Sequence, residues 1–173
     1  MASTRLTDMG AWMRQVDERL RTTEFAAMQK KQRAVISREA ARSQPQAQTS
    51  IPWDTAQYQT PLELPIWDSG NATIVKLRAV GWWEINARIV FASNSTGTRN
   101  AFIVQSGPGT TWDQDTKVAA TSGSTFLRLQ RRVYSDGLFS FAIQTTQSIT
   151  GGGDLALQVG HHLCRVEVEY LGP

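Results

Sequence analysis

The sequence predicts a mainly β protein, an antiparallel jelly-roll sandwich of about eight strands preceded by a coiled-coil-like N-terminal α-helix. Three observations predict this fold class. Apolar residues recur at helical spacing in residues 1–42, four prolines interrupt residues 43–70, and residues 71–173 alternate between apolar and polar with a period of two. We therefore expect three parts with these bounds: a helix, a proline-rich extended connector and a β-domain.

The N-terminal part carries a narrow apolar seam whose steps of three and four residues match the a and d positions of about two heptads. The seam consists of Leu6, Met9, Met13, Val16 and Leu20. A second, weaker stripe continues it through Phe25, Met28, Gln32 and Val35, so we expect the helix to end just before residue 43. So narrow a seam predicts oligomerisation or docking on a larger partner. The alternative is a helix that packs on its own β-domain.

The connector is rich in proline, because Pro45, Pro52, Pro61 and Pro65 all fall within it. Proline removes a backbone donor and fixes φ, which excludes a helix or a central strand. The first third of the connector is interpreted as a linker. The rest also carries Trp53, Tyr58 and Trp67, so we expect extended chain laid against the β-domain or against a neighbouring subunit.

The β-domain divides into short alternating segments separated by turn residues. Strands are expected over residues 72–78, 81–93, 99–105, 124–135, 138–145, 155–159 and 162–171. Asn94 to Gly97 is read as a turn, residues 107–116 as a loop, and Asp136-Gly137 as a hairpin signal. No Cys…Trp…Cys spacing supports an immunoglobulin-like sandwich, so a jelly roll is preferred.

One stretch, "GWWEINARIVFASNSTGTRNAFIV", resembles the central signature of the jelly-roll superfamily of complement C-one-q and tumour necrosis factor. "SGSTFLRLQRRVYSDGLFSFAIQTTQSI" resembles the later paired strands of that superfamily, and "RVEVEYLG" its closing strand. The resemblance covers residues 71–171 and implies a homotrimer around a threefold axis. Similar domains occur in small bacteriophage tail and head-fibre proteins, often behind a short N-terminal helix. Two features depart from the usual pattern: Asp136-Gly137 stands in place of Gly-Asp, and the ending alternates in charge.

Three large residues are candidates for the trimer interface, because they oppose the core-facing side of their strands. Trp82 and Trp83 are adjacent and must face opposite ways, and Trp83 shares the parity of the core residues. Trp82 therefore needs cover from a subunit contact. The same argument applies to Phe102 or Ile103, of which Phe102 is taken as the candidate, and to Phe126. Packing of this face against residues 51–68 is the alternative.

The sequence carries no catalytic set, so an enzyme is the least expected class and no cofactor or metal site is predicted. Adjacent His161 and His162 point to opposite faces of an extended chain, and Cys164 is expected to be a buried, inert thiol. The stretch Trp112, Asp113 and Asp115 is a candidate ligand loop for a sugar or a cation. Its alternative is an exposed polar loop with the tryptophan tucked onto the sandwich.

The charge distribution restricts the partners. Residues 1–50 carry nine lysines and arginines against five acids, whereas residues 51–173 carry nine against ten. The near-neutral β-domain argues against a broad nucleic-acid surface. No apolar run approaches the roughly 20 residues of a membrane span, so no membrane insertion is expected.

The resemblance to domains of small phage tail and head-fibre proteins, together with the N-terminal helix and the lack of a catalytic set, implies a non-enzymatic virion structural protein of a bacteriophage, made in the host cytoplasm. The first choice is a trimeric minor tail or fibre protein. Its partners are further copies of itself, other virion proteins held through the N-terminal helix, and a host cell-surface glycan. The alternatives are a capsid decoration protein or head fibre anchored by that helix, and a bacterial cytoplasmic binding module.

Overall fold

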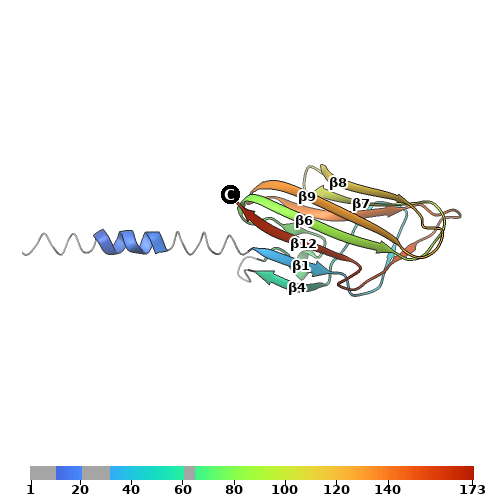
Figure 1. Cartoon of the computed structure of the whole chain (residues 1–173), viewed down its shortest axis with the longest axis horizontal. Coiled ribbons are helices and arrows are strands. Elements are labelled where there is room, and N and C mark those ends of the chain that lie inside the picture. Colours follow the sequence, from blue (N-terminus) through green and yellow to red (C-terminus); the bar gives the residue numbers. More distant parts are fainter. Residues whose placement is uncertain (1–10, 21–31, 61–64) are drawn as a thin grey trace, which may run out of the picture.

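The computed structural model describes residues 11–20, 32–60 and 65–173, and Figure 1 shows their arrangement. Residues 11–20 form a helix, and residues 32–60 and 65–173 form an antiparallel β-sandwich. This confirms the predicted fold class, a mainly β chain with one short N-terminal helix. The described part has more strands than expected because several of them, such as β3 (Thr49–Ser50), are only two or three residues long.

The larger sheet has seven strands. They are β1 (Arg33–Ser37), β2 (Arg42–Gln44), β4 (Thr55–Thr60), β6 (Val80–Phe91), β9 (Thr125–Asp136), β11 (Leu155–Leu157) and β12 (Arg165–Gly172). Strand β6 lies between β12 and β9 and pairs with β9 over its whole length, from Val80 opposite Asp136 to Phe91 opposite Thr125. On the far side of β12 follow β1 and then β4 (Figure 1).

The smaller sheet has five strands, β3, β5 (Val75–Lys76), β7 (Thr98–Gln105), β8 (Thr111–Val118) and β10 (Ser140–Gln147). Strand β10 pairs with β7, and β8 forms the edge beyond β7. The strand expected over residues 72–78 is reduced to β5, which pairs with the beginning of β10. A single 3₁₀ turn at Ser69–Asn71 precedes β5, with the Asp68 side chain as its N-cap.

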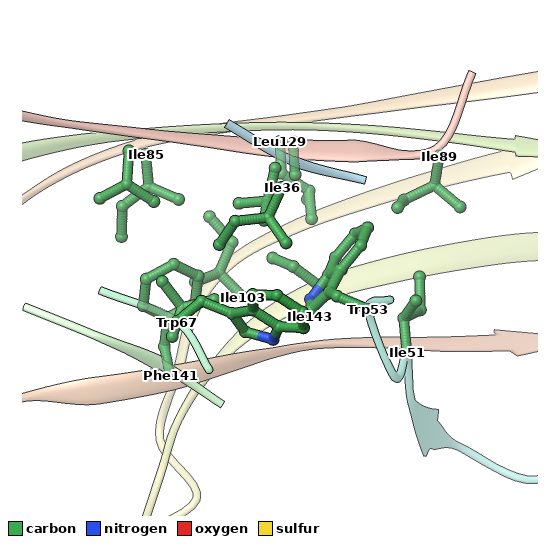
Figure 2. Packing of buried hydrophobic residues seen from close by; sticks show 14 of the residues in the cluster. Ile36, Ile51, Trp53, Trp67, Ile85, Ile89, Ile103, Leu129, Phe141 and Ile143 are labelled. Carbon is green, nitrogen blue, oxygen red and sulfur yellow. The ribbon is translucent and has the colours of Figure 1, made fainter. Parts of the chain in front are cut away.

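The core lies between the two sheets. In Figure 2, Ile85, Ile89 and Leu129 of the larger sheet face Ile103 and Phe141 of the smaller one. Trp83 is completely buried, which confirms the parity predicted for it. Burying each such side chain contributes on the order of 1.5–3 kcal/mol, so the alternation along β6 fixes which face of the strand points inward.

The predicted helix boundary at residue 42 is wrong. Residues 33–37 form β1, in which Ala34 and Ile36 are buried and the strand is paired on both sides, with β12 and β4. As a strand, this segment finds backbone hydrogen-bond partners in both neighbouring strands. These partners favour the strand over the helix that the stripe through Gln32 and Val35 predicts. Phe25 and Met28 of that stripe lie outside the described residues.

The connector also belongs to the sandwich. The expected linker starts inside β2, which pairs with β11, so the linker interpretation is wrong for this segment. Its later part does lie against the β-domain, as predicted, because Trp53 and Trp67 are buried in the core (Figure 2). Ile51, from the expected linker, is buried there as well.

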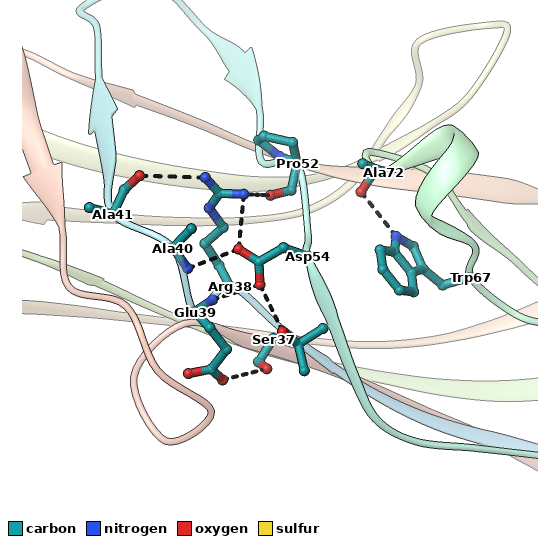
Figure 3. A network of polar contacts seen from close by, with 10 residues as sticks. Ser37, Arg38, Glu39, Ala40, Ala41, Pro52, Asp54, Trp67 and Ala72 are labelled. Carbon is teal, nitrogen blue, oxygen red and sulfur yellow. Dashed lines mark hydrogen bonds and ion pairs between the residues drawn. The ribbon is translucent and has the colours of Figure 1, made fainter.

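A polar network fastens this N-terminal stretch (Figure 3). The Arg38 guanidinium donates to the Pro52 carbonyl at 3.1 Å and forms an ion pair with Asp54 at 3.0 Å. Asp54 in turn accepts hydrogen bonds from the backbone amides of Glu39 and Ala40, at 2.8 and 2.9 Å. The bend between β1 and β2 is thereby tied to the segment that enters β4.

Both turns that the sequence marks most clearly cross from one sheet to the other. The turn before Thr98 joins β6 to β7, and Asp136-Gly137 joins β9 to β10, so the predicted hairpin at Asp136 is wrong. Gly97 has φ 77°, and a Cβ there would lie 1.6 Å from the Ser148 carbonyl oxygen, so only glycine can occupy it. The buried Arg99 supports the same crossing by donating to the carbonyl oxygen of Ser148 at 2.9 Å.

Candidate interaction surface

The candidate site is the outer face of the seven-stranded sheet, the face turned away from the core. Its middle is formed by alternate residues of β6, namely Trp82, Glu84, Asn86 and Arg88. Because neighbouring strands are antiparallel and in register, each of these residues lies in the middle of a cross-strand row. The row continues to a residue of β9 on one side and of β12 on the other. The face is therefore a set of cross-strand rows with distinct chemistry.

The first row is aromatic. Trp82 lies opposite Tyr134, and their rings meet edge to face with 5.6 Å between centroids. Each side chain stays 48% exposed, so the pair covers little of its own surface. A hollow of about 440 Å³ beside them is lined by Trp82, Arg132, Leu171 and the last two residues of the chain, Gly172 and Pro173. Such exposed aromatic surface beside a hollow is typical of interaction sites.

The next two rows are charged and largely paired. Glu84 accepts hydrogen bonds from Arg132 Nε at 3.4 Å and from Gln130 Nε2 at 3.3 Å. Glu167 of β12 is bonded to Arg33 of β1, and this hydrogen bond raises the pKa of Arg33. Glu84 and Glu167 are therefore already paired with arginines of the neighbouring strands.

The last row is basic. Arg88 lies between Arg165 of β12 and Arg128 of β9 in the strand register. The Arg88 guanidinium sits over the Phe126 ring, 5.2 Å from its centroid. A second hollow of about 370 Å³ opens beside this row and contains Asn86, Gln130 and Glu167 in its wall. Sequence reasoning missed the row, because no local pattern reveals which arginines of three distant strands become neighbours.

The three residues predicted for a trimer interface do not share one face. Trp82 and Phe126 both lie on the outer face of the seven-stranded sheet, on β6 and β9. Phe102 lies on β7 of the other sheet, where it is opposite Gln114 and Gln144. The described residues 51–60 and 65–68 do not cover Trp82, because they pack into the core and onto β1 while Trp82 stays exposed.

The seam of the N-terminal helix is described only in part. Met13, Val16 and Leu20 fall in the helix at residues 11–20, whereas Leu6 and Met9 lie outside the described residues. Met13 is 62% and Leu20 54% exposed. These apolar side chains are thus available to a partner.

The predicted ligand loop is a strand. Trp112 belongs to β8 and packs against Phe139 and Phe141, with ring centroids 6.0 Å apart in both pairs. Asp113 accepts a hydrogen bond from the backbone amide of Gln130 at 2.9 Å, and Asp115 accepts one from the amide of Arg128 at 2.8 Å. Both carboxylates therefore bridge the edges of the two sheets, and their role as ligands of a sugar or a cation stays a prediction.

The only cysteine in the sequence behaves as predicted. Cys164 is completely buried, and burial raises the pKa of its thiol to about 12, so the thiol stays protonated and inert. Within the described ranges, no three histidine, cysteine or acidic side chains gather where they could hold a metal ion. The helix at residues 11–20 is too short and too polar to cross a membrane, and no other described segment forms a long apolar helix.

Known structures share this architecture. No family model and no curated protein matches the sequence. A crystal structure of murine APRIL aligns over 81% of this chain and 98% of its own, with a TM-score of 0.59 at 10% identity. The globular domain of zebrafish complement 1qA covers 82% and 98%, with a TM-score of 0.57 at 7% identity. Eiger TNF from S. frugiperda covers 81% and 92%, with a TM-score of 0.57 at 12% identity. The chain therefore has the jelly-roll fold of these tumour necrosis factor-like and complement 1q-like structures.

Proposed function

We propose that this chain is a non-enzymatic, homotrimeric jelly-roll module that is displayed on a bacteriophage particle as a minor tail or fibre protein. In this proposal the outer face of the seven-stranded sheet packs against neighbouring copies. The N-terminal helix attaches the trimer to other virion proteins, and the remaining surface of the sandwich meets the host cell, where a surface glycan is the proposed partner.

One observation carries the trimer proposal. Among strand residues of the described part, seven large apolar side chains are strongly exposed, and six of them belong to the seven-stranded sheet. These six are Tyr58, Val80, Trp82, Phe126, Tyr134 and Leu171, whereas Val118 on β8 is the seventh. An apolar surface concentrated on one sheet is stabilised when another protein surface covers it.

The charges of the same face support the proposal that the surface covering it belongs to another copy of this chain. Acids and arginines stand side by side on it: Glu84 and Glu169 face each other in the strand register, and Arg33 and Arg132 flank them. A face that carries both signs offers pairing partners to a second copy of itself. The fold likeness to tumour necrosis factor and complement 1q structures supports the same arrangement, through the trimer that the family resemblance implies.

The trimer is tested by light scattering on the full chain. We expect three copies of the 19.2 kDa chain in solution. Trp82→Glu places a charge in the centre of the proposed interface and should reduce the mass to one chain, because a buried unpaired carboxylate is strongly unfavourable. Phe102→Glu, on the other sheet, is the matched control and should keep the trimer. A wild-type monomer, or equal dissociation of both variants, would contradict the proposal.

The place on the particle is tested by quantitative mass spectrometry of purified phage. A tail or fibre protein is expected in a small multiple of three copies per particle. Copy numbers that match the symmetry of the capsid would instead assign the chain to decoration of the shell. Absence from particles would overturn the virion role while leaving the trimer measurement unaffected.

A further inference from the structure

The row of Arg165, Arg88 and Arg128 places three positive charges next to one another on one sheet face. The register sets Arg88 directly opposite Arg165 on one side and Arg128 on the other. Directly opposed residues of antiparallel strands have Cβ atoms about 4.5–5.5 Å apart, and like charges at such positions are destabilising. Such a row of like charges destabilises the folded chain unless a negatively charged group lies beside it.

No acid of the described chain offsets this row. None of the three guanidinium groups forms an ion pair within residues 11–20, 32–60 and 65–173. Two acids of the same face are engaged elsewhere, because Glu167 is bonded to Arg33 and Glu84 to Arg132. At the β9 edge, Asp115 accepts from the Arg128 backbone amide and forms an ion pair with Lys117 at 3.7 Å.

The row also has room for a ligand. The hollow of about 370 Å³ beside it is lined by all three arginines together with Asn86, Gln130 and Glu167. Glu167, the only acid in this wall, is already paired with Arg33. The Phe126 ring beneath Arg88 restricts the position of its guanidinium. Arg88 Nε is buried and has no hydrogen-bond partner among the described residues, so one strong donor in this row is left unsatisfied.

We propose that the basic row is a binding site for a tetrahedral oxyanion of the phosphate or sulfate class. Guanidinium groups bind such anions through paired N–H donors, and the three arginines that line this hollow supply such donors. The site is local, which agrees with the near-neutral charge of residues 51–173. It goes beyond the proposed function. Because the row lies on the same sheet face as the proposed trimer contact, the mass of each arginine variant is measured by light scattering alongside phosphate binding, so that loss of the anion site and loss of the trimer are distinguished.

Binding is tested on the full chain with inorganic phosphate, by thermal unfolding and by 31P NMR at constant ionic strength. We expect about 50 mM phosphate to raise Tm by roughly 2–4 °C relative to chloride, as for a ligand with a dissociation constant near 10 mM. Arg88→Gln and Arg165→Gln should each weaken binding about tenfold, because each removes charge-assisted hydrogen bonds. The quantity compared is the rise in Tm within each variant, so any change in the stability of the unliganded protein cancels.

Arg131→Gln is the matched control. Arg131 lies on the same strand as Arg128 but is opposite Ile85 in the register, on the other side of β9, and it is exposed. This variant removes the same charge and should keep the full response to phosphate. If all three variants respond like the wild type, or if chloride raises Tm as much as phosphate, general screening explains the effect and the proposal is overturned.

A second pair of probes identifies the source of the anion. Glycerol 1-phosphate carries the same group on a larger molecule. Competition between it and inorganic phosphate would show that the hollow accepts a phosphate carried by a larger molecule, and binding of the free ion alone would assign the site to a structural anion. If neither probe changes the 31P signal or Tm of the wild type, the proposal fails even where an arginine variant does not fold.

Discussion

At the scale of single residues, Asp54 shows how one carboxylate organises the start of the sandwich. Burial by itself raises the pKa of Asp54, but hydrogen bonds from the amides of Glu39 and Ala40, from the Thr55 hydroxyl and the charge of Arg38 outweigh it. The pKa is therefore lowered from its ordinary value of 3.8. The ionised form is the one that stabilises the fold, and its side chain is only 25% exposed.

Asp54→Asn is expected to lower the free energy of unfolding by about 1–3 kcal/mol at pH 7, because charge-assisted bonds to two backbone amides and to Arg38 are weakened. The contribution of a carboxylate with a depressed pKa is complete above its unfolded value and is lost as the pH falls through its folded value. The difference between wild type and variant should therefore be constant above about pH 4–5 and shrink below pH 3.8. Denaturant unfolding at a series of pH values measures this difference.

The control is Asp154→Asn, an exposed aspartate outside the strands of the sandwich. It should leave stability within about 0.5 kcal/mol of the wild type at every pH. A pH-independent effect of Asp54→Asn would contradict the assigned role of the carboxylate charge.

At the scale of elements, the edges of the two sheets are closed by side chains. Strand β8 is the edge of the smaller sheet, and β9 pairs only with β6 in the larger one. Asp113 and Asp115 are two residues apart and accept from the amides of Gln130 and Arg128, which are also two residues apart. The matched period of two lets the carboxylates cover backbone donors that would otherwise form an open edge.

Asp115→Ala is expected to speed hydrogen exchange of the Arg128 amide about tenfold, because the loss of one charge-assisted bond of roughly 1.4 kcal/mol changes the opening equilibrium by that factor. The Gln130 amide, held by Asp113, is the internal control and should keep its rate. Asp113→Ala should give the reverse pattern. Equal acceleration at both amides would mean that the variants loosen β9 as a whole.

At the scale of the whole molecule, two elements compete for the role of assembling the trimer. The helix at residues 11–20 exposes Met13 and Leu20, and the seven-stranded sheet exposes Trp82 and its neighbours. A helix of about two heptads is marginal on its own in water. We therefore expect the sheet face to carry the threefold contact and the helix to serve attachment.

The double variant Met13→Glu/Leu20→Glu separates these roles. It should keep the trimer mass in light scattering, because it leaves the sheet face intact, and it should lose attachment to phage particles. Gln15→Glu, an exposed change in the same helix, should lose neither property. A fall to monomer mass in the double variant alone would transfer the assembly role to the helix.

The sequence by itself determined the features that depend only on the alternation of a strand. The parity of Trp82 and Trp83, the burial of Cys164 and the inward side of β12 follow from a period of two and the cost of exposing apolar surface. The fold class follows from the same pattern, repeated between turns over residues 71–173.

The tertiary structure alone decided which segments became neighbours. Residues 33–37 became a strand because β12 and β4 supply partners on both sides, although a helical stripe also runs through them. Asp113 and Asp115 accept hydrogen bonds from backbone amides of β9 because β8 lies beside β9. The arginine row exists only in the register of β12, β6 and β9, since Arg88, Arg128 and Arg165 are far apart in the chain. Strand pairing is a long-range choice between backbone partners, which no local period encodes.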